Sequence, residues 1–171
     1  MTEGSCSSLA LAYAGNKAGY VVYDFRGGQS RTVFSSRDSI RQIASMKGVS
    51  SIMELGINDT ECAERLMSKM EKGHEYYMAT GRHAAVVRLS NEGHYQYLEL
   101  QSEISSDNGW QPLTLRALYE RFGCEDRHKT EWSNYLINIE TLQNNNEFLN
   151  LLGYINTDKM AQKKGVYGHV R

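Results

Sequence analysis

The sequence contains very little proline and cysteine. Its single proline is Pro112, so rigid linkers are few, while eleven tyrosines indicate half-buried strands. The three cysteines, Cys6, Cys62 and Cys124, are widely spaced and form no Cys-x-x-Cys pair. This spacing predicts neither a disulfide framework nor a metal site, and we expect reduced thiols.

Long apolar runs and net charge are also lacking. No run of about eighteen apolar residues occurs, and the N-terminus lacks the basic and apolar segments of a signal peptide. We therefore expect a cytoplasmic protein with no membrane segment. Nineteen basic and twenty acidic residues leave a formal charge of −1, so no global field attracts nucleic acid. A nucleic-acid partner is not expected.

The domain organisation follows from length and composition. A chain of 171 residues with 40% hydrophobic and 23% charged residues can bury one core, and it contains no repeat and no low-complexity tract. We expect one domain over residues 1–157. Residues 158–171 are polar, basic and glycine-containing, and are predicted to form a flexible tail.

Apolar periodicity predicts an α+β fold in which helices come first and mostly antiparallel strands follow. Capping residues and helical spacing predict helices over 9–14, 36–46, 58–70, 113–122 and 144–152. Short β-prone runs predict strands over 20–25, 75–80, 83–89, 94–101 and 135–139. Residues 108–112 are expected in a loop.

Cys6 would open the first helix, because Gly4 to Ser8 supply capping residues before the helical pattern begins. The free amide groups of a first helical turn favour a thiolate, which is the nucleophilic form of cysteine. The alternative is that Cys6 is a small apolar residue that fills core space. Position alone leaves both interpretations open.

His83 begins a predicted strand whose neighbour can be registered from the sequence. A turn over residues 91–93 pairs residues whose numbers sum to about 184, which sets His83 opposite Gln101 and diagonal to Glu99. An oxygen of either residue could hold the imidazole in the tautomer that a general base needs. The alternative is a strand-edge histidine bonded to a backbone carbonyl. A slip of one residue would send His83 and Gln101 to opposite faces.

Two segments carry a resemblance to a known family. Residues 4–13 (GSCSSLALAY) and 17–22 (KAGYVV) resemble the cysteine-helix-strand opening of papain-fold toxin and deamidase-like domains. Residues 81–88 (GRHAAVVR) and 97–101 (YLELQ) are similar to the histidine strand and the following strand end in those families. CHAP-type amidases share this plan, and papain-like modules of phage head-morphogenesis proteins and polymorphic toxins look similar over residues 4–124, about two-thirds of the chain.

The resemblance implies a papain-like fold in which an N-terminal helix carrying Cys6 packs on a mostly antiparallel sheet. It makes Cys6 the nucleophile, His83 the base, and Glu99 or Gln101 the orienting group. The implied activity is thiol-dependent amide hydrolysis or deamidation through an acyl-enzyme on Cys6, without cofactor or metal, on a protein or peptide substrate.

The families also imply biological settings. One is a phage-encoded or toxin effector delivered into a target cell, with a cognate inhibitor or immunity protein as partner. The alternative is a catalytically inactive binding or inhibitory module, since papain places a glutamine before its cysteine for the oxyanion hole and none precedes Cys6. The Cys6 backbone amide remains a candidate donor.

Trp110 and Cys124 are two further candidate positions. Trp110 follows the predicted strand end, where its ring could form one side of the site. The alternative is that it is a hydrophobic anchor for its loop. Cys124 lies four residues before His128, but a local pair on a loop lacks the framework that nucleophile geometry needs. We expect a structural role for both members of this second pair.

Overall fold

A computed structural model describes residues 10, 11, 13, 14, 24, 25, 37–100, 108–143, 145–148, 150, 151, 162 and 163. The chain divides into two compact units, a central unit of Ser51–Ile137 and a terminal unit of Met1–Ser50 with Asn138–Arg171. The predicted boundary at residue 157 lies outside the described residues, so the division into 1–157 and 158–171 stays a prediction. No helix in the described part of the chain is long and apolar enough to cross a bilayer.

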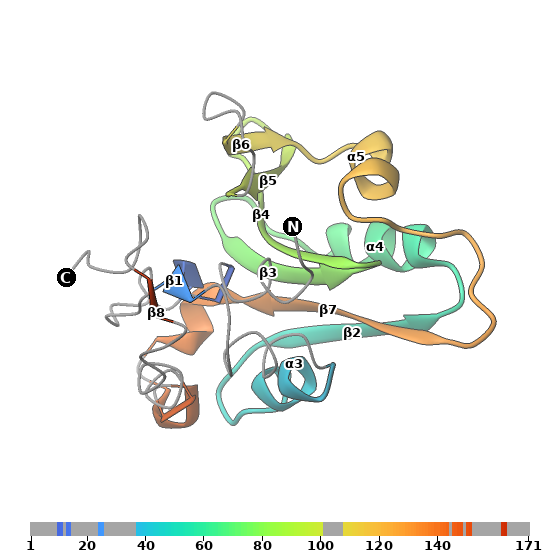
Figure 1. The fold of residues 1–171 in the computed structure, drawn as a ribbon. Helices are drawn as coiled ribbons and strands as arrows, with labels where there is room; N and C mark the ends of the chain where they lie inside the picture. Colours follow the sequence, from blue (N-terminus) through green and yellow to red (C-terminus); the bar gives the residue numbers. More distant parts are fainter. Residues whose placement is uncertain are drawn as a thin grey trace. The chain divides into compact units, whose positions relative to one another are not determined.

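The central unit is built on a six-stranded sheet in the order β2-β7-β3-β4-β5-β6 (Figure 1). Its strands are β2 (Ser51–Gly56), β3 (Glu75–Thr80), β4 (His83–Leu89), β5 (Tyr95–Glu99), β6 (Gly109–Pro112) and β7 (Trp132–Asn138). Antiparallel ladders join β2 to β7, β3 to β4, β4 to β5, and β5 to β6. The predicted α+β class with a mostly antiparallel sheet is confirmed.

Two helices lie against one face of this sheet. They are α4 (Asp59–Met67) and α5 (Leu115–Glu120) (Figure 1). Their buried side chains form one core with inward residues of β3, β4, β5 and β7, namely Ala63, Leu66, Leu118, Met78, Ala85, Val87, Tyr97 and Leu136. The predicted cap of α4 is confirmed, because Asn58 Oδ1 accepts a hydrogen bond from the Glu61 amide at 3.0 Å. Burial of this apolar face stabilises the central unit.

In the terminal unit, α3 (Arg37–Ala44) falls within the predicted helix over 36–46, and it buries Ile40 and Ile43 as its spacing indicated. A 3-10 helix (Ile139–Leu142) follows β7, and Nδ2 of the Asn145 side chain donates to the Lys47 carbonyl at 2.8 Å. Strands β1 (Asp24–Phe25) and β8 (Gln162–Lys163) pair antiparallel. The described residues of the predicted first helix, at 10, 11, 13 and 14, are helical, while Cys6 lies outside the described residues.

Two strands differ from the sequence prediction. The β2 strand was not expected, because its exposed positions carry Met53 and Leu55 and so hide the usual alternation of polar and apolar residues. The β6 strand occupies the segment expected as a loop. Pro112 ends β6 at the edge of the sheet, where a residue without an amide hydrogen is tolerated.

Candidate functional site

The hairpin of β4 and β5 has the register that the turn predicted. Val87 pairs with Tyr97, Arg88 with Gln96, and Leu89 with Tyr95, and each pair of numbers sums to 184. The turn is closed by a hydrogen bond from the Ser90 amide to the His94 carbonyl at 2.8 Å. The register at this end of the hairpin is confirmed. Gln101, predicted opposite His83, lies outside the described residues.

Strand alternation places His83 and Glu99 on the same face of the sheet. His83 shares its face of β4 with Ala85 and Val87, and Glu99 shares its face of β5 with Tyr97. Because Ala85, Val87 and Tyr97 all belong to the core under α4 and α5, this is the face that the helices cover. Two predicted site residues thus lie on one surface.

The carboxylate of Glu99 is held by an arginine that the sequence did not single out. Arg121, the C-cap residue after α5, donates to Glu99 Oε2 from Nη2 at 2.9 Å and to Oε1 from Nε. The side chain of Glu99 is 9% exposed and that of Arg121 is 23% exposed. A two-point bond of this kind fixes the orientation of both planar groups. No spacing pattern links these two residues, which lie 22 positions apart on different elements.

The His83 ring packs against Phe122. Their ring centres are 5.0 Å apart in an edge-on contact, and Tyr97 contacts the same phenylalanine edge-on at 5.6 Å. Burial of the ring and, to a smaller extent, the positive charge of Arg121 lower the pKa of His83 to about 3, while Glu99 acts in the opposite direction. His83 is therefore a neutral imidazole at pH 7.

This titration gives a first prediction. In the unfolded chain a histidine takes up a proton near pH 6.5, whereas folded His83 resists protonation until about pH 3. Below pH 6.5 the unfolded state therefore binds more protons than the folded state. For each pH unit in that range, His83 should lower the free energy of unfolding by at most about 1.4 kcal/mol. Urea unfolding of the wild type and of His83→Gln at pH 7.5, 5.5 and 4.5 measures it.

We expect His83→Gln to flatten the loss of stability below pH 6.5. The matched control is His94→Gln, at an exposed position in the β4–β5 turn, which should leave the pH dependence unchanged. A proton resonance of the His83 ring that titrates near pH 6.5 in folded protein would contradict the assignment.

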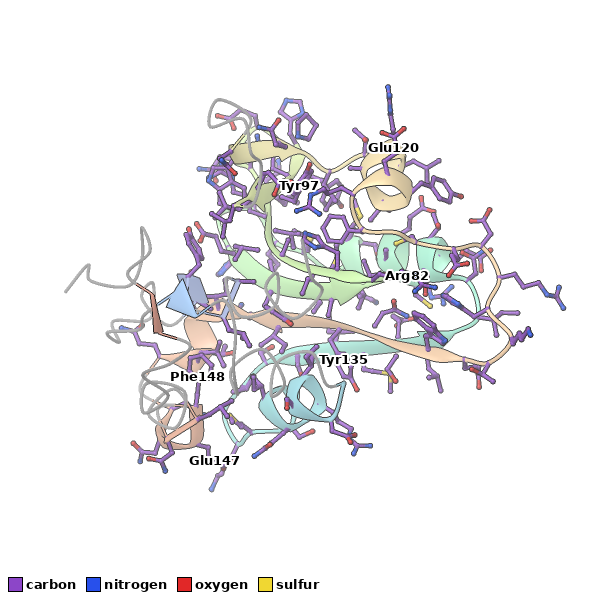
Figure 2. The ribbon with its side chains drawn as sticks, viewed as in Figure 1. Arg82, Tyr97, Glu120, Tyr135, Glu147 and Phe148 are labelled. Atoms are coloured by element: carbon purple, nitrogen blue, oxygen red, sulfur yellow. The ribbon has the colours of Figure 1, made fainter. Side chains whose placement is uncertain are left out.

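A pocket of about 450 Å³ opens beside this cluster, between β5, β6 and α5. In Figure 2, Tyr97 extends from the strand side and Glu120 from the helix side. The lining residues are Tyr97, Gln111, Pro112, Thr114, Arg116, Ala117, Glu120 and Arg121. Its volume lies within the range of small-ligand sites. Tyr97 and Arg121 thus belong to both the pocket wall and the surroundings of His83.

Trp110 is placed away from this surface. Trp110 lies in β6 and pairs with Leu98 of β5. Its side chain therefore lies on the other face of the sheet from Tyr97 and Gln111. There the guanidinium of Arg88 sits 3.9 Å from the centre of its ring, and Arg88 also donates to the Gln96 side chain at 2.8 Å. This cation–π contact anchors β6 to the hairpin. The structure does not bring Trp110 to His83.

The two cysteines in the described part of the chain are buried free thiols. Burial raises the pKa of Cys62, and it raises the pKa of Cys124 to about 12. Cys124 Sγ lies 3.6 Å from the hydroxyl of Thr80. Both thiols are therefore protonated at neutral pH and shielded from solutes, which are the properties of unreactive cysteines.

His128 faces a carboxylate instead of a thiol. Its Nε2 lies 2.6 Å from Asp59 Oδ2, which also accepts a hydrogen bond from the Glu125 amide at 3.0 Å. The His128 ring stacks on Trp132 with centres 3.6 Å apart. These contacts tie the loop before β7 to the start of α4. His128 therefore contacts Asp59 and Trp132, and its structural role stays a prediction.

Among the described residues, no three side chains of histidine, cysteine, aspartate or glutamate come together in a geometry that would hold a metal ion. Comparison of the chain with models of protein families, with curated proteins and with solved structures finds no match. The candidate functional site is therefore the surface formed by His83, Glu99, Tyr97 and Arg121, together with the pocket beside it.

Proposed function

We propose that the protein is a thiol-dependent amide hydrolase or deamidase of papain-like design, with Cys6 as nucleophile and His83 as general base. The observation that carries the proposal is the shared surface of His83 and Glu99 beside the 450 Å³ pocket. His83 is a neutral imidazole at pH 7, which is the form that accepts a proton, although its lowered pKa also makes it a weaker base than a solvent-exposed histidine.

In the proposed reaction, His83 accepts the Cys6 thiol proton as the sulfur attacks the carbonyl carbon of a substrate amide. The C–N bond then breaks, His83 returns the proton to the leaving nitrogen, and a thioester on Cys6 remains. The leaving group is ammonia in deamidation and an amine in peptide cleavage. Water, deprotonated by His83, hydrolyses the thioester and restores the thiol.

The geometry bears on which residue orients His83. Both carboxylate oxygens of Glu99 accept hydrogen bonds from Arg121, and each oxygen keeps a second lone pair with which it could accept from an imidazole. Glu99 and Gln101 therefore both remain proposed orienting groups for the imidazole. The assignment of the nucleophile is supported by elimination, because Cys62 and Cys124 are buried and protonated.

One observation favours a second candidate function, an inactive papain-like binding module. A cysteine activated as a thiolate needs an imidazolium beside it, and both burial and the charge of Arg121 disfavour the imidazolium of His83. A site of this kind would bind a peptide segment without turning it over.

Alkylation with iodoacetamide separates the two functions. We expect Cys6 to react at least ten times faster than glutathione at pH 7, and His83→Gln to slow it at least tenfold, because the base is lost. Peptide mapping by mass spectrometry assigns each adduct, and buried Cys62 and Cys124 serve as internal references that react only in urea. His94→Gln is the matched control. A Cys6 rate equal to that of glutathione in both His83 forms would exclude the enzyme.

A further inference from the structure

The charged groups around the pocket include two arginine–carboxylate pairs. Arg116 donates from Nε to both oxygens of Glu120, at 3.1 Å each, and Arg121 is bonded to Glu99. Each arginine is matched by one carboxylate, so the four side chains carry no net charge together. The Arg116–Glu120 pair stands at the rim, with 82% and 65% of its side chains exposed.

The remaining lining is neutral. Tyr97, Pro112 and Ala117 offer apolar surface, and Gln111 and Thr114 add an amide and a hydroxyl. An amide side chain can both donate and accept hydrogen bonds, which suits a peptide backbone or an uncharged polar side chain. A charged ligand side chain would face a like charge in one of the pairs or would have to open the pair.

We propose that this pocket is a subsite that takes an uncharged segment of a peptide and discriminates against both basic and acidic side chains. Naming a peptide as the ligand rests on the proposed amide chemistry. Two of the residues that line the pocket, Tyr97 and Arg121, also belong to the surroundings of His83. Tyr97 contacts Phe122, which contacts His83, and Arg121 acts electrostatically on the His83 ring. The bound segment therefore lies next to the proposed reacting amide.

Three blocked tripeptides test the selectivity, acetyl-Gly-Gln-Gly-amide and its Glu and Lys counterparts. Binding is measured on the Cys6→Ala protein, which cannot turn them over, by the shifts of the Gln111, Thr114 and Ala117 backbone amides in NMR spectra. We expect the Gln peptide to bind at least threefold more tightly than either charged peptide. The factor is modest because exposed charges are screened by solvent.

Charge variants make the test specific to the pocket. Arg116→Gln leaves Glu120 uncompensated and should favour the Lys peptide about threefold, while Glu120→Gln should favour the Glu peptide by a similar factor. The exchanged pair R116E/E120R restores neutrality and should restore the preference for the Gln peptide. The matched control is the exposed pair Asp38 and Arg41 in the terminal unit, exchanged as D38R/R41D, which should change nothing.

The outcome can be read independently of the chemistry on Cys6. Equal affinity for the three peptides, or shifts that avoid the pocket amides, would overturn the subsite even if Cys6 is reactive. Selective binding together with an unreactive Cys6 would support the subsite and assign it to the binding module.

Discussion

Replacing Arg121 by methionine is expected to lower the free energy of unfolding of the central unit by about 3 kcal/mol and to raise the pKa of His83. The substitution leaves the carboxylate of Glu99, 9% exposed, without its two-point partner. Removing the charged partner of a buried carboxylate is costly, because the charge stays buried after the ion pair is lost. The pKa of His83 should rise because the positive charge that lowers it is removed. Urea unfolding followed by the fluorescence of Trp110 and Trp132, both in the central unit, measures the first effect.

Two further variants control this result. Glu99→Gln removes the group that raises the pKa of His83, so that pKa should fall while Arg121→Met makes it rise. The double variant R121M/E99M removes both charges and should recover most of the lost stability, since a buried pair can be replaced by apolar groups at little cost. NMR titration of the His83 ring reports the signs. If the pKa of His83 changed in the same direction in both single variants, the electrostatic coupling of His83 to Arg121 and Glu99 would be refuted.

The second large effect is expected at Gly81, in the turn between β3 and β4. Its φ of +59° is left-handed, and a Cβ there would meet the Phe122 carbonyl oxygen at 2.5 Å and the Cys124 amide nitrogen at 2.9 Å. Both are backbone atoms, so the turn and the loop after α5 must separate. Gly81→Ala should therefore cost about 2–4 kcal/mol, the sum of the left-handed backbone and the overpacking.

Gly73→Ala is the control for this variant. Gly73 has a similar left-handed φ of +81°, but the nearest atom to its added Cβ is an Asn91 side-chain oxygen at 3.5 Å, an ordinary contact. It should cost about 1 kcal/mol, which is the backbone part alone. The difference between the two urea midpoints isolates the close approach at Gly81. Equal urea midpoints for the Gly81 and Gly73 variants would mean that a Cβ at residue 81 does not clash with the Phe122 backbone.

The close contact between the Gly81 turn and the Phe122 backbone also affects the surroundings of His83. The Arg82 amide donates to the Phe122 carbonyl at 2.8 Å, and Phe122 packs against the His83 ring. We therefore expect Gly81→Ala to change the environment of His83 and bring its pKa closer to 6.5, because a loosened turn exposes the ring to water.

Features set by local chemistry were predictable from the sequence. The cap at Asn58 depends on residues within one helical turn, and the register of the β4–β5 hairpin depends on its own turn. The face shared by His83 and Glu99 follows from that register by alternation. These interactions need no distant segment, so a short stretch of sequence determines them.

Only the tertiary structure decided which side chains from distant segments meet. The β2 strand finds β7, with Ile52 opposite Leu136, although its exposed Met53 hides the strand pattern. Arg121 reaches Glu99 because α5 crosses the face of β5, and no spacing in the sequence encodes that crossing. The sequence by itself determined the hairpin and the surface that carries His83. The neutral imidazole and the charge-balanced pocket beside it depend on burial and on ion pairs that exist only after α5 packs against the sheet.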